Sequence, residues 1–179
     1  MDVSKLSQGE RIAGISGVAL LLIMFIFDWF SIEAEGGGGP SVGGNAWDTM
    51  DLIRWLLLLA GIAAIALAVI GAGATQPNMP VAMSAITAGL GILGLIFVII
   101  RIISPPDEGL GDLVDVGRSI GVWLGLIAVA GVAYGGWTAM QEEGTSFGDQ
   151  ADRFGGGGGE APPPPPPPSA PPGGGGPAA

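Results

Sequence analysis

The 179-residue sequence contains no cysteine and no histidine, and only six lysine and arginine residues. The missing cysteines exclude disulfides and thiolate chemistry, and the missing histidines exclude imidazole metal ligands and histidine acid–base catalysis. Sixteen Asp and Glu residues outnumber the cations, so the formal net charge is −10. Six scattered cations cannot form the basic surface that nucleic-acid binding needs, so we expect no nucleic-acid partner.

Charged residues of both signs are also scarce, at 12% of the chain against 49% hydrophobic residues. A soluble domain usually carries about 25% charged residues. There are four apolar runs of about 20 residues, the first of which continues through Asp28 to Phe30, and 20 residues of helix span the roughly 30 Å of bilayer hydrocarbon. The runs have no polar face, which favours lipid over a soluble core as their surroundings. In lipid the backbone N–H and C=O groups of each run must form hydrogen bonds within the run, so we expect helices. These runs are Ile12–Phe27, Trp55–Ala74, Val81–Ile100 and Ile120–Met140.

The sequence therefore predicts an all-α membrane protein, a four-transmembrane-helix bundle. Its expected partner is the lipid bilayer that surrounds the helices. The C-terminal segment differs in composition, because ten of the fifteen prolines and nine glycines follow Arg153. Such a composition cannot bury apolar surface, so we expect a disordered Gly/Pro-rich tail. The expected transmembrane domain covers residues 1–153, with helices at about 8–30, 48–74, 79–103 and 117–141, and the tail covers 154–179.

Local signals mark the expected helix ends. Ser7 and Glu10 form a capping-box pattern before the first helix. Asn45 or Asp48 is suited to cap the second helix. Ser104 and the two prolines that follow it are expected to stop the third helix.

The charge distribution gives the orientation. The two long loops, Ser31–Ala46 and Ser104–Gly117, share one side, whereas the short turn Gly73–Met79 lies on the other side with both termini. Each side carries three cations, so the overall count is tied. The first helix usually dominates orientation, and its N-terminal flank holds Lys5 and Arg11 while the first long loop holds no cation. We therefore expect a multi-pass protein of the plasma membrane with both termini cytoplasmic.

Tryptophans lie near the ends of the expected helices. Indole rings prefer the headgroup region of a bilayer, so tryptophans at helix ends form belts. The sequence places Trp29, Trp55 and Trp123 at the outer interface and Trp137 at the inner one.

Asp28 and Arg54 are the charges closest to hydrocarbon at the outer ends of the first two expected helices. We expect them to form an interfacial ion pair, because an unpaired charge near hydrocarbon is costly. Arg101 is a competing partner for Asp28. Two alternatives remain: Asp28 is a solvated carboxylate at the interface, or it marks an ion pathway, as intramembrane carboxylates often do.

Four acidic residues in the second long loop resemble a cation site. Hard cations such as Ca²⁺ take several carboxylate oxygens, but this spacing matches no EF-hand loop. The apolar residues between these acids favour a short interfacial helix instead. The glycine runs lack the context of a phosphate loop. We therefore expect no metal and no cofactor. The acids are Asp107, Glu108, Asp112 and Asp115.

Small residues recur at a spacing of four in the last expected helix. Gly121 and Gly125 form one GxxxG motif, and Gly131 and Gly135 form another. Small side chains let helix backbones approach closely in lipid. The motifs favour close helix packing, either within the bundle or between copies in a homo-oligomer.

Seven consecutive prolines, Pro162–Pro168, are expected to adopt polyproline II between two glycine runs. One interpretation is a docking ligand for an aromatic groove of a protein partner. The other is a spacer without a dedicated partner.

Several landmarks in the first 153 residues together resemble uncharacterised four-helix integral membrane proteins of high-GC Gram-positive bacteria. The resemblance excludes the tail and implies the fold, but it implies no activity and no functional residue. Claudins and tetraspanins share the four-helix layout, but their extracellular cysteines are absent here. The landmarks are Phe27–Phe30, Asn45–Asp48, Arg101–Pro106, Gly121–Leu126 and Gly135–Trp137.

The sequence favours a non-enzymatic scaffold or accessory subunit that presents the polyproline tail to a partner in the cytoplasm. The alternative is a small transporter or channel subunit, which needs polar or broken-helix residues at the membrane midplane. An enzyme is the weakest hypothesis, because without histidine or cysteine catalysis would depend mainly on loop carboxylates such as Asp107 and Asp112.

Overall fold

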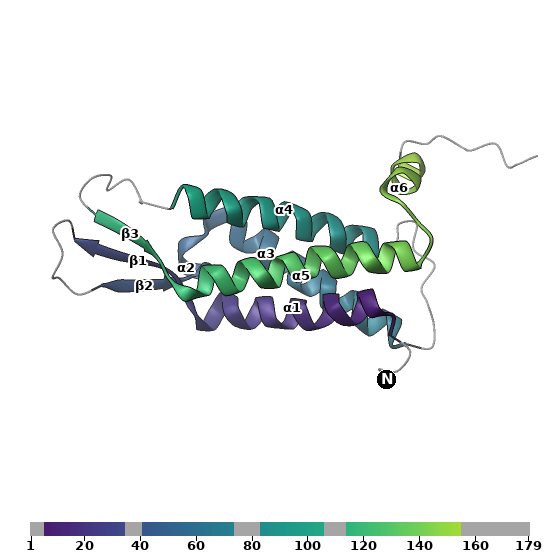
Figure 1. Cartoon of the computed structure of the whole chain (residues 1–179), viewed down its shortest axis with the longest axis horizontal. Helices are drawn as coiled ribbons and strands as arrows, with labels where there is room; N and C mark the ends of the chain where they lie inside the picture. The colour runs from purple at the N-terminus through teal and green to yellow at the C-terminus, as the bar shows by residue number, and fades with distance from the viewer. Residues whose placement is uncertain (1–5, 35–40, 74–82, 106–113, 155–179) are drawn as a thin grey trace, which may run out of the picture.

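The computed structural model of the chain describes residues 6–34, 41–73, 83–105 and 114–154. Four long helices form a bundle, a small sheet extends from one end of it, and a short helix lies at the other end (Figure 1). Each of the four long helices is long and apolar enough to cross a membrane. The elements are α1 (Gln8–Ile26), β1 (Asp28–Ala34), β2 (Val42–Asn45), α2 (Ala46–Thr49), α3 (Asp51–Gly71), α4 (Met83–Ile103), β3 (Val114–Arg118), α5 (Ile120–Glu142) and α6 (Phe147–Phe154).

The four long helices are arranged in a ring. Helix α1 packs against α3 and α5, and α4 packs against the same two helices from the opposite side. Neighbours run antiparallel, so the start of α1 and the end of α5 lie at the same end of the bundle (Figure 1). We call this the terminal end, and the opposite end, which carries the strands, the sheet end.

The sheet corrects the all-α prediction. Strand β1 lies between β2 and β3 and pairs antiparallel with both. Phe30 is opposite Gly44 on one side and Arg118 on the other. The two long loops thus supply strands that are far apart in the sequence. Glycine-rich β2 has low intrinsic strand propensity, so local composition does not reveal this pairing.

Several helix bounds also differ from the prediction. Helix α1 ends at Ile26, not near residue 30, because Phe27 adopts an extended conformation (φ −102°, ψ 139°) that leads into β1. The second expected helix is divided into α2 and α3 at Met50, whose φ and ψ of −116° and 40° are not helical. Helix α5 begins at Ile120, because the chain forms β3 up to Arg118 and Ser119 is the N-cap. Helix α6 extends across the expected boundary after Arg153.

The local end signals are confirmed for α1 and α4, whereas Asn45 caps the short α2 and the long helix α3 begins after Met50 without a side-chain cap. Ser7 caps α1 and forms a capping box with Glu10. Asn45 caps α2, because its side chain accepts a hydrogen bond from the backbone N–H of Asp48 (3.0 Å). Helix α4 ends at Ile103, immediately before Ser104 and the two prolines.

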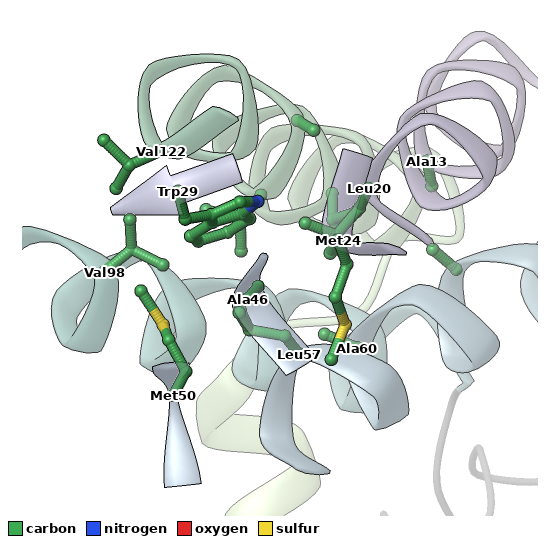
Figure 2. Close-up of a cluster of buried hydrophobic side chains, with 14 of the residues drawn as sticks. Ala13, Leu20, Met24, Trp29, Ala46, Met50, Leu57, Ala60, Val98 and Val122 are labelled. Atoms are coloured by element: carbon green, nitrogen blue, oxygen red, sulfur yellow. The ribbon is translucent and has the colours of Figure 1, made fainter. Parts of the chain in front are cut away.

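Small side chains are buried between the helices, and many large apolar side chains are exposed, which is unlike a soluble protein. The contacts between the helices are made largely by fully buried small residues, such as Ala13, Ala60, Ala64 and Ala88. Larger buried side chains gather towards the sheet end, where Trp29 lies among aliphatic side chains and methionines (Figure 2). Many large apolar side chains point outward instead, among them Ile15, Leu22, Leu59, Ile62, Ile96 and Ile127.

Candidate functional site at the junction of the sheet and the bundle

Trp29 fixes the sheet to the end of the bundle. Its side chain is completely buried, and its indole Nε1 donates a hydrogen bond to the carbonyl of Ile23 (3.2 Å). A Cβ atom added at Gly125 would collide with the indole ring, and one added at Gly121 would collide with the backbone of Asp28. The first glycine pair of α5 therefore makes room for β1, not for another helix.

The predicted place of Trp29 in an outer aromatic belt is therefore wrong. The ring faces inward, because the chain turns into β1 after Phe27 and carries Trp29 over the end of the bundle. The other tryptophans of the predicted belts, Trp55, Trp123 and Trp137, are exposed on the surfaces of their helices.

The second glycine pair of α5 brings that helix close to α1. A Cβ atom at Gly135 would collide with the backbone of Ala13, and one at Gly131 would collide with the hydroxyl of Ser16. The next residue, Gly136, serves the other neighbour in the same way, because a Cβ there would lie 2.5 Å from the backbone nitrogen of Ala88 in α4. Helix α5 thus uses adjacent glycines for close contacts with two different helices.

All four predicted packing glycines therefore lie against parts of the same chain. The role of Gly136 was missed, and so was that of Gly9, where a Cβ would collide with the backbone of Ala139. A signal for Gly9 was present, because Gly9, Ala13 and Gly17 place small residues at a spacing of four along α1. That spacing is the pattern expected of close helix contacts in lipid.

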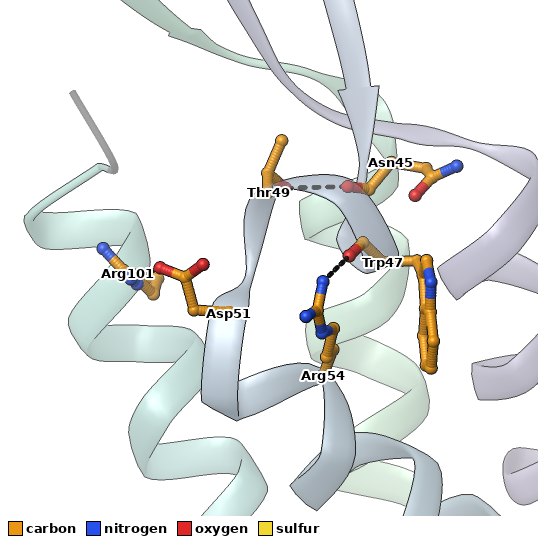
Figure 3. Close-up of polar contacts among 6 residues, drawn as sticks. All are labelled: Asn45, Trp47, Thr49, Asp51, Arg54 and Arg101. Atoms are coloured by element: carbon orange, nitrogen blue, oxygen red, sulfur yellow. Dashed lines mark hydrogen bonds and ion pairs between the residues drawn. The ribbon is translucent and has the colours of Figure 1, made fainter. Parts of the chain in front are cut away.

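Arg54 lies on the first turns of α3, where it binds the segment that precedes this helix (Figure 3). Its Nη1 donates a hydrogen bond to the carbonyl of Trp47 (3.0 Å). Its guanidinium carbon lies 5.4 Å from the centroid of the Trp47 ring and 6.0 Å from that of Trp55. Such cation–π contacts contribute roughly 0.5–2 kcal/mol, depending on desolvation. The Nε of Arg54 is buried without a hydrogen-bond partner among the residues that the structure describes.

The ion pair predicted between Asp28 and Arg54 is not formed. Asp28 stands at the start of β1 with an exposed side chain that lies against Gly43 of β2. Within the described ranges, the ion pair at this end joins Arg101 of α4 to Asp51 of α3 (3.8 Å). The prediction failed because α1 ends before Asp28, so this residue belongs to the sheet.

The third arginine at the sheet end is also bound within the chain. Arg118, the last residue of β3, donates a hydrogen bond from Nε to the carbonyl of Ile102 near the end of α4 (2.7 Å). Arg54, Arg101 and Arg118 therefore each fasten one element to another. The arrangement holds the sheet, α2 and the helix ends together, because each of these arginines binds a neighbouring element.

Two carboxylates at the C-terminal end of α5, Glu142 and the C-cap residue Glu143, link the helices at the terminal end. Glu142 accepts a hydrogen bond from the backbone N–H of Gly9 in the first turn of α1 (3.2 Å). Glu143 accepts one from the hydroxyl of Ser84 in the first turn of α4 (2.6 Å). A carboxylate near a helix N-terminus is favoured by the helix dipole. Both contacts therefore stabilise the antiparallel arrangement.

Most of the acidic cluster considered as a cation site lies outside the described residues, and only Asp115 is described, with an exposed side chain in β3. The polyproline segment also lies outside them. Within the described part of the chain, no group of three or more acidic, histidine or cysteine side chains is close enough to hold a metal ion.

Comparison with known proteins adds no relative. No protein-family model, characterised protein or solved structure matches this chain. The resemblance to membrane proteins of high-GC Gram-positive bacteria therefore stays a prediction.

Proposed function

We propose that the chain is a multi-pass integral membrane protein that acts as a non-enzymatic scaffold or accessory subunit and presents its proline-rich tail to a protein partner. The observation that carries the membrane part is the placement of side chains by size. Small residues make the helix contacts, while large aliphatic side chains face outward along all four helices. In water such a surface promotes aggregation, whereas in lipid it is the expected exterior.

The scaffold role is supported by how firmly both ends of the bundle are held. The arginines at the sheet end and the two glutamates at the terminal end join neighbouring elements. The buried hydroxyls of Ser84 and Thr87 are bound too, to Glu143 and to the carbonyl of Met83. These polar groups in α4 are therefore engaged in structure, which favours the scaffold over the alternative of a transporter or channel subunit.

The tail begins at the terminal end of the bundle, because it follows α6, which lies beyond α5 at that end (Figure 1). With both termini cytoplasmic, the tail is presented in the cytoplasm and the sheet outside the cell. The cations of the N-terminal flank support this orientation.

Cysteine labelling tests the orientation cleanly, because the chain has no native cysteine. We expect Ser41→Cys, next to β2, to react with an impermeant maleimide on intact cells. We expect Ser169→Cys, in the tail, to react only after the membrane is opened. The opposite pattern would reverse the orientation without changing the number of spans.

Crosslinking in native membranes tests the scaffold role. The full chain is compared with a variant that lacks Pro162–Pro168 and with a variant in which these prolines are replaced by a Gly/Ser segment of equal length. We expect a crosslinked partner that depends on the prolines and not on length alone. Ion or solute flux through liposomes that contain the purified chain alone would favour the transporter alternative instead.

A further inference from the structure

A groove of about 540 Å³ follows the seam between α1 and α3 towards the terminal end. Small residues, Gly14 and Ala68, let the two helices approach closely at this seam, because a Cβ atom at Gly14 would lie 2.6 Å from the Cβ of Ala68. The exposed side chains of Ile15, Val18 and Val69 stand along the groove. Except for Arg11, all its described lining residues are apolar or glycine.

The length of the groove corresponds to part of one leaflet. Its α1 side extends from Arg11 to Val18, and its α3 side from Ile65 to Ala72. Seven residues of helix rise roughly 10 Å. Half of the bilayer hydrocarbon is about 15 Å thick. With the bundle inserted as proposed above, the groove would begin at the interface of the terminal end and stop before the bilayer midplane.

Arg11 differs from the arginines of the sheet end. Its exposed side chain makes no hydrogen bond or ion pair with the described residues. The neighbouring carboxylate of Glu10 forms no ion pair with Arg11; it accepts a hydrogen bond from the backbone N–H of Ser7 (2.8 Å) and lies against Gly71. The groove thus joins an apolar surface to one cation, Arg11, which has no hydrogen-bond or ion-pair partner among the described residues.

We propose that this groove binds an anionic phospholipid of the leaflet at the terminal end. One acyl chain lies along the seam of α1 and α3, and Arg11 contacts the headgroup phosphate. The proposal rests on the membrane insertion proposed above. It goes beyond the scaffold function, because it assigns a lipid ligand to a defined place on the bundle.

A second copy of the chain fits the groove less well. In a symmetric dimer within a membrane, the twofold axis is parallel to the membrane normal, so equivalent residues lie at the same depth. Two copies joined groove to groove would bring their Arg11 side chains together at one interface. Like charges repel there, whereas a phosphate group complements each of them.

Native mass spectrometry of the full chain tests the proposal. The protein is released from vesicles that contain equal amounts of phosphatidylglycerol and phosphatidylcholine with the same acyl chains. We expect bound phosphatidylglycerol to exceed phosphatidylcholine roughly fivefold, the preference that one cation near a membrane surface provides. Arg11→Gln should abolish the preference, and Arg11→Lys should retain most of it.

A charge-matched control separates the groove from the interface as a whole. Gln141 is exposed near the end of α5, at the same end of the bundle but outside the groove. The double variant Arg11→Gln/Gln141→Arg keeps the net charge, and we expect it to remain without preference. Shortening the walls by Ile15→Ala/Val69→Ala should reduce retention of both lipids.

Three results would overturn the proposal: no preference in the unmodified chain, a preference restored by the Gln141→Arg control, or a dimer that excludes lipid and thus makes the groove an interface between copies. Extraction of the chain from vesicles by alkaline carbonate would instead refute membrane insertion, and the lipid site with it. Insertion without lipid preference would refute the lipid site alone.

Discussion

The contact between Gly125 of α5 and the buried ring of Trp29 provides a sharp test of how the sheet is fixed to the bundle. An added methyl group at Gly125 would overlap the six-membered part of the indole ring. The ring cannot turn away freely, because it is completely buried and its Nε1 is bound to the carbonyl of Ile23. Gly125→Ala should therefore destabilise the protein.

The size of the effect follows from two opposing contributions. Replacing a helical glycine by alanine stabilises a helix by up to about 1 kcal/mol. Overpacking a well-packed core costs about 1–3 kcal/mol. Gly89→Ala in α4 is the matched control, because a Cβ atom there would have no neighbour within 4 Å. The difference in unfolding free energy between the two variants isolates the clash, so we expect it to be about 1–3 kcal/mol.

The assay is equilibrium unfolding in mixed micelles, in which SDS is titrated into a mild detergent and helix content is followed by circular dichroism. A smaller ring should relieve the clash, so Gly125→Ala should cost less in a Trp29→Phe background. For residues in direct contact we expect a coupling of at least about 0.5 kcal/mol. If Gly125→Ala stabilised the protein as much as Gly89→Ala does, or if the two sites were strictly additive, our account of this contact would be refuted.

Three further predictions concern other contacts. Gly135→Ala should destabilise the bundle more than Gly131→Ala in the same SDS assay, because the added methyl meets the backbone of α1 in the first variant and a rotatable hydroxyl in the second; equal losses would contradict this. Asp28→Asn and Arg54→Gln should have additive effects on unfolding free energy, because these residues form no ion pair; a measured coupling above about 0.5 kcal/mol would restore the pair. Truncation after Phe154 should leave the unfolding free energy of the detergent-solubilised bundle unchanged, and a marked loss would mean that the tail packs on the helices.

The sequence alone was sufficient for the features that depend on local composition. Apolar runs such as Ile12–Phe27 predicted four long helices, because length and hydropathy are properties of each segment by itself. The capping box of Ser7 and Glu10 was also predictable, since all its atoms lie within one turn.

The sheet end could not be predicted in this way. Strand β1 pairs with β3, whose residues come much later in the chain, and no local pattern encodes that meeting. The predicted place of Trp29 was therefore wrong, because an indole at a helix end and an indole on a strand folded over the bundle look the same in the sequence.

Contacts between distant segments also decided which groups the charged side chains bind. Arg54 binds the Trp47 carbonyl because the helix is interrupted at Met50, between α2 and α3. Asp28 does not pair with Arg54 because α1 ends at Ile26, so Asp28 belongs to β1. The sequence determined which segments are apolar enough for lipid, since that depends on composition over about 20 residues. Only the tertiary structure decided which glycine meets which backbone and which carbonyl or carboxylate binds each arginine of the sheet end, because those choices depend on how distant segments pack.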